Sequence, residues 1–287
     1  MAQIFCMALT VATVVAALPA MDSQSQAQPF VHTPATPWNA GGLNEFPIHS
    51  SCNVTQRRQI ELGLAEAVIL AAHARDHILR WSNESEIYRK YFGDSPSMEA
   101  IGAYEVVVSG DKNGILFRCD NPDGNCDIDG WAGHWRGENG TEQTVICDLS
   151  YQTRRSLATM CAMGYTVSES ETNTFWASDL LHRLYHLPSI GQEWVNHHAD
   201  DYGEVLNLAR QLPMLSTHDS ETLQYFALEV YAHDISVPGI GCSGDSDIGR
   251  YESNTGATVT STTSVSSTTS SASTNCHTHA GGELHCN

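Results

Sequence analysis

The sequence predicts an α+β protein that is mainly α, built as one disulfide-stabilised domain with a small antiparallel sheet and a disordered tail. Three observations support this fold class. Apolar residues recur at helical spacing over long stretches on both sides of a short region that favours strands. Nine cysteines are present, and eight remain once the hydrophobic N-terminus is set aside. A tract of almost pure Ser and Thr follows the last helical stretch and lacks the apolar residues of a core.

The N-terminus is predicted to be a secretory signal peptide, residues 1–20. The apolar run from Ile4 to Leu18 is too short to span a bilayer and is followed by small and polar residues. Cleavage fits after Ala20 or after Ala27. Residues 21–45 are expected to be extended, and the mature chain to be extracellular or cell-wall associated. An even number of cysteines fits that compartment, because they can pair as disulfides. The sequons at Asn53, Asn83 and Asn139 fit it as well.

The domain is predicted to span residues 46–242. A long helix is expected at 55–81, followed by a short helix that ends at Gly93. Two strands, Tyr104–Val108 and Ile115–Cys119, are expected to form a hairpin, and "TVICDL" a further strand. Cys119 and Cys126 are expected to tie down the loop between them. Helices are then predicted at 152–163, 173–187, 198–211 and 219–234. The Ser/Thr-rich linker covers 243–275, and a Cys/His tail covers 276–287.

The charge of the chain is strongly acidic. There are 33 Asp and Glu against 14 Lys and Arg, a net of −19 with histidines neutral. Such a surface repels nucleic acid and anionic membranes and attracts cations. No apolar run after the leader is long enough for a membrane span. Fourteen histidines are present. They bind transition metals when neutral, so metal binding is expected to weaken below about pH 6.

The stretch "DLLHRLYHLP" contains the strongest candidate for a metal site. His182 and His186 are four residues apart, which places both imidazoles on one face of a helix. In the zinc-peptidase signature H-E-x-x-H a glutamate follows the first histidine, whereas Arg183 stands here. Two histidines buried for packing alone would be the alternative. We expect Arg183 to pair with Asp179, one turn earlier, because its cation is unfavourable beside zinc.

A third zinc ligand is expected from "EWVNHHADDYG". Asp200 is favoured and His197 is the second candidate, and a solvated acidic turn is the alternative without metal. The pair His73 and His77 in "HARDH" has the same four-residue spacing. It lacks an obvious third ligand nearby in sequence, so surface or ion-pair roles are the simpler interpretation. The alternative is that the pair is part of a second metal site.

The tail "CHTHAGGELHCN" is a second candidate for zinc. His277 and His279 precede a Gly-Gly turn and His285 follows it. A bridge between Cys276 and Cys286 would bring the three imidazoles together, and reduced thiols would themselves bind zinc. An incidental cluster of histidines at a disordered end is the alternative.

These motifs resemble a known family. The runs "HARDHILRW", "FRCDNPDGNC", "WAGHWRG", "FWASDLLHRLYH" and "CHTHAGGELHCN" are similar to those of the fungal pH-regulated antigen and zincophore family, which includes a major mould allergen. The layout also resembles deuterolysin-like metallopeptidases, so a zincin-like domain is implied. In that likeness His182 and His186 correspond to the two zinc histidines, and Arg183 replaces the glutamate.

The resemblance implies a secreted zinc scavenger. It further implies return of zinc to the cell through a fungal plasma-membrane zinc transporter, and binding of host proteins such as complement regulators or fibrinogen. Arg183 cannot accept a proton from a zinc-bound water, which argues against hydrolysis. Two alternatives stay open. One is an active zinc peptidase with a base such as Glu193 or an acid near residue 200, and the other is an adhesion protein with only structural zinc.

Overall fold

The computed structural model describes residues 36–244, 276–278 and 284–286. The predicted signal peptide, residues 1–20, and nearly all of the predicted linker lie outside these ranges. The chain divides after Ala40 into two units, and the unit from Gly41 onward contains every described helix and strand. No described helix has the length and apolarity that a membrane span requires.

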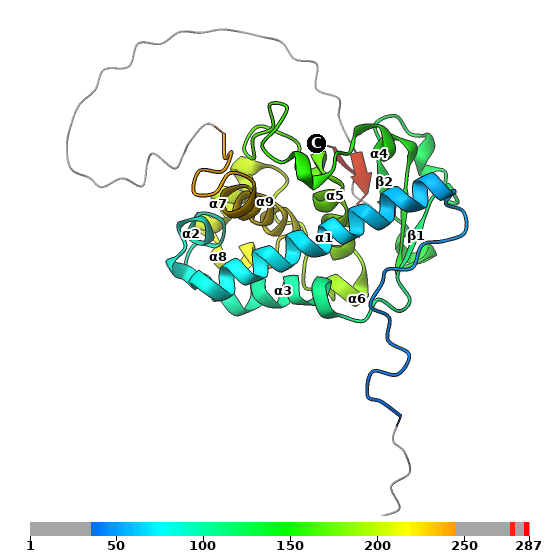
Figure 1. Ribbon diagram of the computed structural model, residues 1–287, viewed down its shortest axis with the longest axis horizontal. Coiled ribbons are helices and arrows are strands. Elements are labelled where there is room, and N and C mark those ends of the chain that lie inside the picture. Colours follow the sequence, from blue (N-terminus) through cyan, green and yellow to red (C-terminus); the bar gives the residue numbers. More distant parts are fainter. Residues whose placement is uncertain (1–35, 245–275, 279–283, 287) are drawn as a thin grey trace, which may run out of the picture. The chain divides into compact units, whose positions relative to one another are not determined.

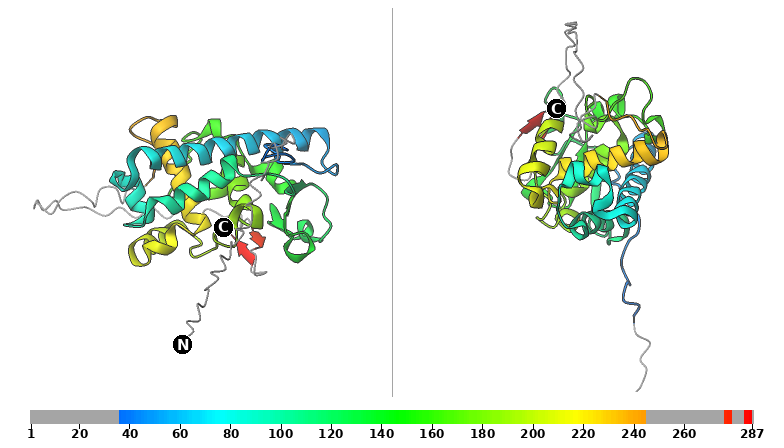
Figure 2. Two further views of the ribbon diagram at one scale, coloured as in Figure 1. Left: turned by 90° about the horizontal axis from the view of Figure 1, so that it is seen from below. Right: turned by 90° about the vertical axis from the view of Figure 1, so that its left-hand side faces the viewer.

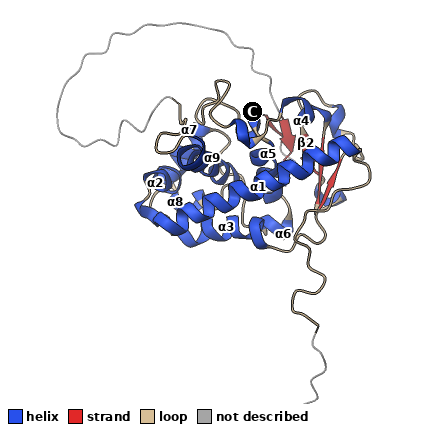
Figure 3. Ribbon diagram, viewed as in Figure 1, coloured by secondary structure: helices blue, strands red, loops and turns tan. Residues whose placement is uncertain are grey.

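Helices make up most of the described domain, as Figure 3 shows. The α-helices are α1 Val54–Trp81, α2 Glu86–Phe92, α3 Ser97–Ser109, α4 Asp148–Thr153, α5 Trp176–Tyr185, α6 Pro188–Gly191, α7 Tyr202–Gln211, α8 Pro213–Ser216 and α9 Ser220–Tyr231. The strands are β1 Leu116–Arg118, β2 Gly133–Trp135, β3 Gln143–Ile146, β4 Cys276–Thr278 and β5 Leu284–Cys286. The prediction of a mainly helical α+β protein is confirmed.

Helix α1 spans the domain and packs along α3, α5 and α9 (Figure 1). It begins with a capping box, in which Asn53 and Gln56 satisfy each other's backbone amides. Gly63 brings α1 very close to α5. A Cβ atom placed there would lie 2.8 Å from Leu180 Cδ1 and 2.8 Å from Trp176 Cβ. The absence of a side chain at Gly63 therefore sets the spacing between α1 and the helix that carries the histidine pair.

The three-stranded sheet is mixed rather than antiparallel. Strand β3 lies in the centre, parallel to β1 and antiparallel to β2. The expected hairpin was wrong, because Tyr104–Val108 belongs to α3. Ala100, Tyr104 and Val107 are its fully buried residues, and their spacing is helical. Burial of this face against α1 outweighs the strand preference of the run "YEVVV".

The later helices are shorter than predicted. The expected helix at 152–163 is replaced by α4 and a 3₁₀ turn, Leu157–Thr159. Helix α7 begins only at Tyr202, because the Asp201 side chain caps it by accepting a hydrogen bond from Glu204 N. Pro188 ends the preceding segment as predicted and also opens α6.

Three disulfides connect the domain. They join Cys52 to Cys119, Cys126 to Cys147, and Cys161 to Cys242, with sequence separations of 67, 21 and 81 residues. Cys119 and Cys126 thus do anchor the loop between them, each through a different partner. The third bridge fixes the segment after α9 to the loop after α4.

Helix α5 lies at the centre of the domain. Each of its residues is buried, including the polar ones. It packs against α1 on one side and α9 on another. Figure 2 shows α1, in blue to cyan, running along one side of the domain. Nearly every polar group on α5 therefore needs a partner inside the protein.

Candidate metal centre

Three histidines converge at the end of α5. His182 and His186 come from this helix and its C-terminal cap, and His197 comes from the turn before α7. The Nε2 atoms of His182 and His186 are 3.1 Å apart, and those of His186 and His197 are 3.4 Å apart. Two nitrogens on one tetrahedral zinc ion are about 3.3 Å apart, given Zn–N distances of about 2.0–2.1 Å. The spacing therefore suits a zinc ion.

His182 is oriented by a buried carboxylate. Its Nδ1 lies 3.1 Å from Glu221 Oε1 on α9, and Glu221 is wholly buried. A carboxylate at one imidazole nitrogen favours the tautomer that carries hydrogen there, so the opposite nitrogen keeps its lone pair. Metal-binding histidines in proteins usually have such a partner. Glu221 contacts the ring nitrogen opposite Nε2, the atom that approaches His186.

His197 is held by the start of α9. The turn is fixed to that region by two backbone hydrogen bonds, from Asn196 N to His218 O (2.8 Å) and from Ser220 N to Asn196 O (2.9 Å). The Ser220 hydroxyl lies 3.2 Å from His197 Nδ1 and 3.5 Å from its Nε2. This arrangement directs an imidazole distant in sequence toward the pair on α5.

Asp219 completes the attachment of this turn. One carboxylate oxygen accepts hydrogen bonds from the amides of His198 (2.7 Å) and Ala199 (3.1 Å), and the other caps α9 through Thr222 N (2.8 Å). Burial raises the pKa of Asp219 to about 6, even though these hydrogen bonds act in the opposite direction. One buried carboxyl thus links the turn carrying His197 to the helix carrying Glu221.

Arg183 forms a buried ion pair with Asp179. Its Nε and one terminal nitrogen donate to Asp179 at 2.9 and 3.2 Å, and Arg154 donates to the same carboxylate at 3.1 Å. The expected pairing is confirmed. The guanidinium also lies against Gly133 on β2, where a Cβ atom would be 2.6 Å from it. Arg183 is thus directed to the sheet side of α5.

Two pKa shifts follow from this burial. Burial, and next the Arg183 guanidinium, lower the pKa of His182 to about 4. Burial would raise the pKa of Asp179, but Arg154 and Arg183 outweigh it, so this pKa lies below its usual value. Near neutral pH His182 is therefore uncharged, the form that binds metal, and Asp179 is ionised.

Asp200 occupies a different position from the histidine group. The structure brings the second candidate, His197, together with the pair, and Asp200 is not a member of this three-residue group. It is exposed, and its amide donates to Glu204 at 3.0 Å. It lines a cavity of about 490 Å³ together with Glu169, Glu171, Asp201 and other residues.

The pair His73 and His77 converges on one carboxylate. His73 Nε2 and His77 Nδ1 lie 3.1 and 2.6 Å from Asp234 Oδ2, and His233 Nδ1 lies 2.8 Å from Asp234 Oδ1. His77 also contacts Ser85 Oγ at 2.7 Å. These contacts connect α1 to the segment after α9, and they are hydrogen bonds that become ion pairs where the histidine is protonated, in line with the simpler interpretation.

The tail forms two short paired strands. In the antiparallel pairing of β4 and β5, Cys276 stands opposite Cys286 and His277 opposite His285. His279 lies outside the described residues. This register places the two cysteines opposite each other, as a Cys276–Cys286 disulfide would require. The tail histidines stay predicted zinc ligands.

Sequence reasoning missed the residues that support the histidines. Glu221, Asp219 and Ser220 come from α9 or its cap, and "THDSETLQ" resembles an ordinary capped helix start. The burial of Glu221 would have indicated a role at the histidine group, but the sequence pattern of this helix does not reveal that burial. Glu193, proposed as a catalytic base, is exposed.

Comparison with known proteins finds relatives that match most of the chain. The chain is 59% identical over 302 residues to the major allergen Asp f 2 of Aspergillus fumigatus, covering 96% of this chain and 95% of that protein. It is 54% identical over 209 residues to the pH-regulated antigen PRA1 of Candida albicans, covering 72% and 70%. A zinc peptidase structure from Grifola frondosa aligns with a TM-score of 0.46 at 13% identity, covering 62% of this chain and 97% of that one.

The family assignment rests on the sequence profile. The profile described as "HRXXH: Putative peptidase family" matches residues 2–245, which include "HRLYH" at His182 to His186. With the two antigen relatives, this match covers the whole described domain up to Gly244. The chain therefore belongs to the HRXXH putative peptidase family, together with fungal antigens that share most of its length.

Proposed function

We propose that this chain is a secreted zinc-binding protein that carries zinc rather than using it for hydrolysis. The observation that supports this most directly is the pairing of two features on α5. Three histidine nitrogens converge at zinc-ligand spacing, while Arg183, at the position of the peptidase base, is buried against Asp179. An arginine cannot accept a proton at relevant pH, and loss of a positioned base lowers hydrolysis by about 10²- to 10⁴-fold.

The proposed zinc ligands are His182, His186 and His197, with Glu221 as the residue that orients His182. Water or a further side chain would complete a tetrahedral site. His197 thus takes the place of the third ligand for which the sequence favoured Asp200, which is exposed three residues later in the chain. The tail histidines would add a second binding region.

The proposed biological role is that of a zincophore, which takes up extracellular zinc for the fungal cell. Three features support it. The chain is acidic, the domain contains three disulfides that suit an oxidising compartment, and the allergen relative matches over 95% of its length. Delivery through a plasma-membrane transporter and binding of host proteins are expectations from the family resemblance.

Zinc titration by calorimetry at pH 7.5 tests this proposal. The full chain should be compared with variants that carry His182→Ala, His186→Ala or His197→Ala in a background where His277, His279 and His285 are replaced by Ala. We expect each of the three changes to abolish the remaining tight binding. His198→Ala is the matched control, because His198 is exposed beside His197 and should leave binding unchanged.

A hydrolysis assay separates the carrier from the peptidase alternative. Zinc-loaded, homogeneous protein is incubated with a denatured protein substrate, and we expect no cleavage. Cleavage that disappears in His186→Ala would overturn the carrier proposal. Unchanged zinc binding in the triple variant His182→Ala/His186→Ala/His197→Ala would overturn the site itself.

A further inference from the structure

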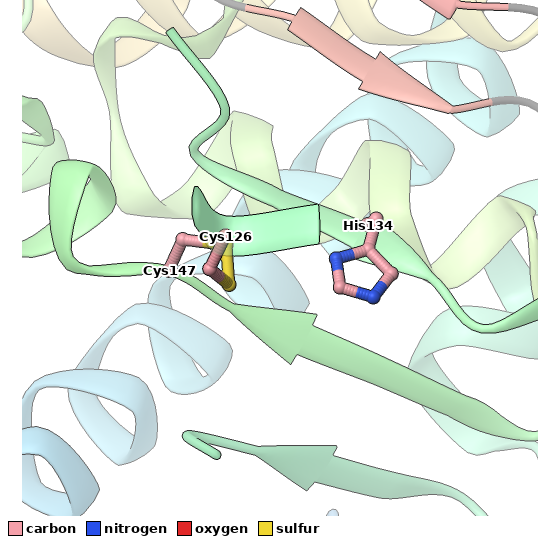
Figure 4. Close-up of side chains that lie close together, drawn as sticks. All are labelled: Cys126, His134 and Cys147. Atoms are coloured by element: carbon pink, nitrogen blue, oxygen red, sulfur yellow. A yellow bond between two sulfur atoms is a disulfide. The ribbon is translucent and has the colours of Figure 1, made fainter. Parts of the chain in front are cut away.

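A second group of metal-binding side chains lies around a disulfide on the sheet side of α5. Cys126 sits in the 3₁₀ turn Asn125–Asp127, Cys147 caps α4, and His134 lies on β2. Ligand atoms of these three residues all lie within 4.8 Å of one another, with the two sulfurs joined as a disulfide. Figure 4 shows the His134 ring beside this bridge.

His134 is prepared as a metal ligand by its surroundings. It is 1% exposed, and its Nε2 lies 3.1 Å from Asp123 Oδ2. Arg136 holds the same carboxylate through two hydrogen bonds of 2.8 and 3.0 Å. Because an ionised carboxylate only accepts, hydrogen belongs on Nε2 and the lone pair on Nδ1.

The other ring nitrogen of His134, Nδ1, is buried as well. Among the residues that the structure describes, nothing forms a hydrogen bond with the buried Nδ1 of His134. Figure 4 shows one ring nitrogen on the side of the ring that faces the disulfide. A buried polar atom without a hydrogen-bond partner is destabilising, so packing alone is an incomplete explanation for this histidine.

We propose that Cys126, Cys147 and His134 form a latent zinc site that opens when the disulfide between the two cysteines is reduced. The ligands are two thiolate sulfurs and His134 Nδ1, with water in the fourth position. Asp123 orients the His134 ring by accepting a hydrogen bond from Nε2, as carboxylates do in established zinc sites. This site shares no ligand with the histidine group on α5 and does not depend on it.

The chemistry balances with a trialkylphosphine as the reductant. The phosphine provides two electrons, the Sγ–Sγ bond breaks, water oxygen goes to phosphorus, and the two water protons go to the sulfurs. Zinc then displaces both thiol protons. Two thiolates, one Zn²⁺ and a neutral imidazole sum to zero charge, so the buried site needs no further counter-ion.

The positions of the two cysteines allow both steps. Cys126 is partly exposed, whereas Cys147 is 3% exposed, so the reductant would attack Cys126 Sγ and release the Cys147 thiolate. Their Cα atoms are 5.4 Å apart, and rotation about each Cα–Cβ bond can direct both sulfurs to a common ion. Neither of the other two disulfides belongs to such a group within the described ranges.

Cobalt(II) absorbance provides the test, because the thiolate-to-cobalt charge-transfer band reports bound sulfur and ignores histidine-only sites. The full-length chain carries Cys276→Ser and Cys286→Ser, so that the tail contributes no thiols. Cobalt is added before the phosphine, and far-UV circular dichroism verifies that the fold persists. We expect the band to appear only after reduction and to reach one equivalent of cobalt.

Variants assign the band to this site. Cys126→Ser/Cys147→Ser should abolish it, and Cys161→Ser/Cys242→Ser, which removes a different disulfide, should leave it unchanged. His134→Gln should weaken cobalt binding by at least about tenfold, and Asp123→Asn by about 10- to 100-fold.

Three results would overturn the proposal. They are the absence of the band in reduced and folded protein, a band that is indifferent to both His134→Gln and Asp123→Asn, and unfolding on reduction even with cobalt present. Because Asp123→Asn leaves all three ligands in place, it tests the orientation of His134 even if His134→Gln fails to fold.

Discussion

Arg183 Nε lies 2.9 Å from Asp179 Oδ2, and both side chains are almost fully buried. Arg154 shares the same carboxylate. The residue that replaces the peptidase glutamate is thus part of the internal structure of the domain, and its guanidinium is paired with a carboxylate one turn earlier on α5.

Removal of the shared carboxylate should strongly destabilise the fold. Asp179→Ala leaves two buried guanidinium groups without their partner, and we expect a loss of about 3–5 kcal/mol in the free energy of unfolding, measured by urea denaturation. Asp120→Ala is the matched control. Asp120 pairs with Arg118 but its side chain is 38% exposed, so the loss should stay below about 1 kcal/mol. Equal losses would contradict this account.

Glu221 should control zinc affinity without binding the metal. Glu221→Gln keeps the size of the side chain but removes the charge that fixes the His182 tautomer, so zinc affinity should fall by about 10- to 100-fold in calorimetry. Glu61→Gln, an exposed change on α1, is the comparison and should have no effect. An unchanged affinity in Glu221→Gln would show that the carboxylate does not orient the ligand.

The close approach of α1 and α5 should be intolerant of added atoms. Gly63→Val forces a side chain against Trp176 and Leu180, and we expect a loss of about 1–3 kcal/mol together with weaker zinc binding, because α5 carries two ligands. Gly102→Ala on α3 is the matched control, since nothing lies within 4 Å of its added atom. Thermal denaturation should show it neutral or slightly stabilised.

Stability should decrease as the pH falls below about 6.5, with His77 as one contributor. Burial lowers the pKa of His77, in opposition to Asp234, and neighbouring His73 and His233 lower it further. The unfolded chain, with a histidine pKa of about 6.5, therefore binds a proton that the folded chain resists. The contribution of His77 to the free energy of unfolding is therefore complete above the unfolded-state pKa of about 6.5. It is lost as the pH falls toward the lower pKa of the folded state.

Urea denaturation at pH 7.5 and pH 5 measures this effect. His77→Phe removes the titrating group while keeping a ring beside Phe226, and it should reduce the difference between the two pH values. His198→Phe, at an exposed position, should leave the difference as in the parent chain. An identical pH dependence in all three proteins would contradict a role for His77.

Much of the helical framework followed from local pattern. Helix α1 was predicted to within a residue of its start, because a capping residue and a regular apolar spacing coincide there. The prediction of a hairpin at Tyr104 was wrong, because β-branched residues favour strands locally while packing against α1 decides for a helix. The mixed sheet was not predicted. Its parallel pairing joins β1 to β3, and no local sequence pattern encodes the order of strands in a sheet.

The sequence by itself determined the mainly helical class, the histidine pair on one helix face and the pairing of Arg183 with Asp179, because each depends on spacing along one helix. Only the tertiary structure brought His197, Glu221 and Ser220 to that pair, and His134 to a disulfide. At the histidine group these contacts join residues that are 11 to 39 positions apart in sequence. At the disulfide they join a strand, a turn and a helix cap. They form only when burial of α5 and α9 fixes how separate segments pack.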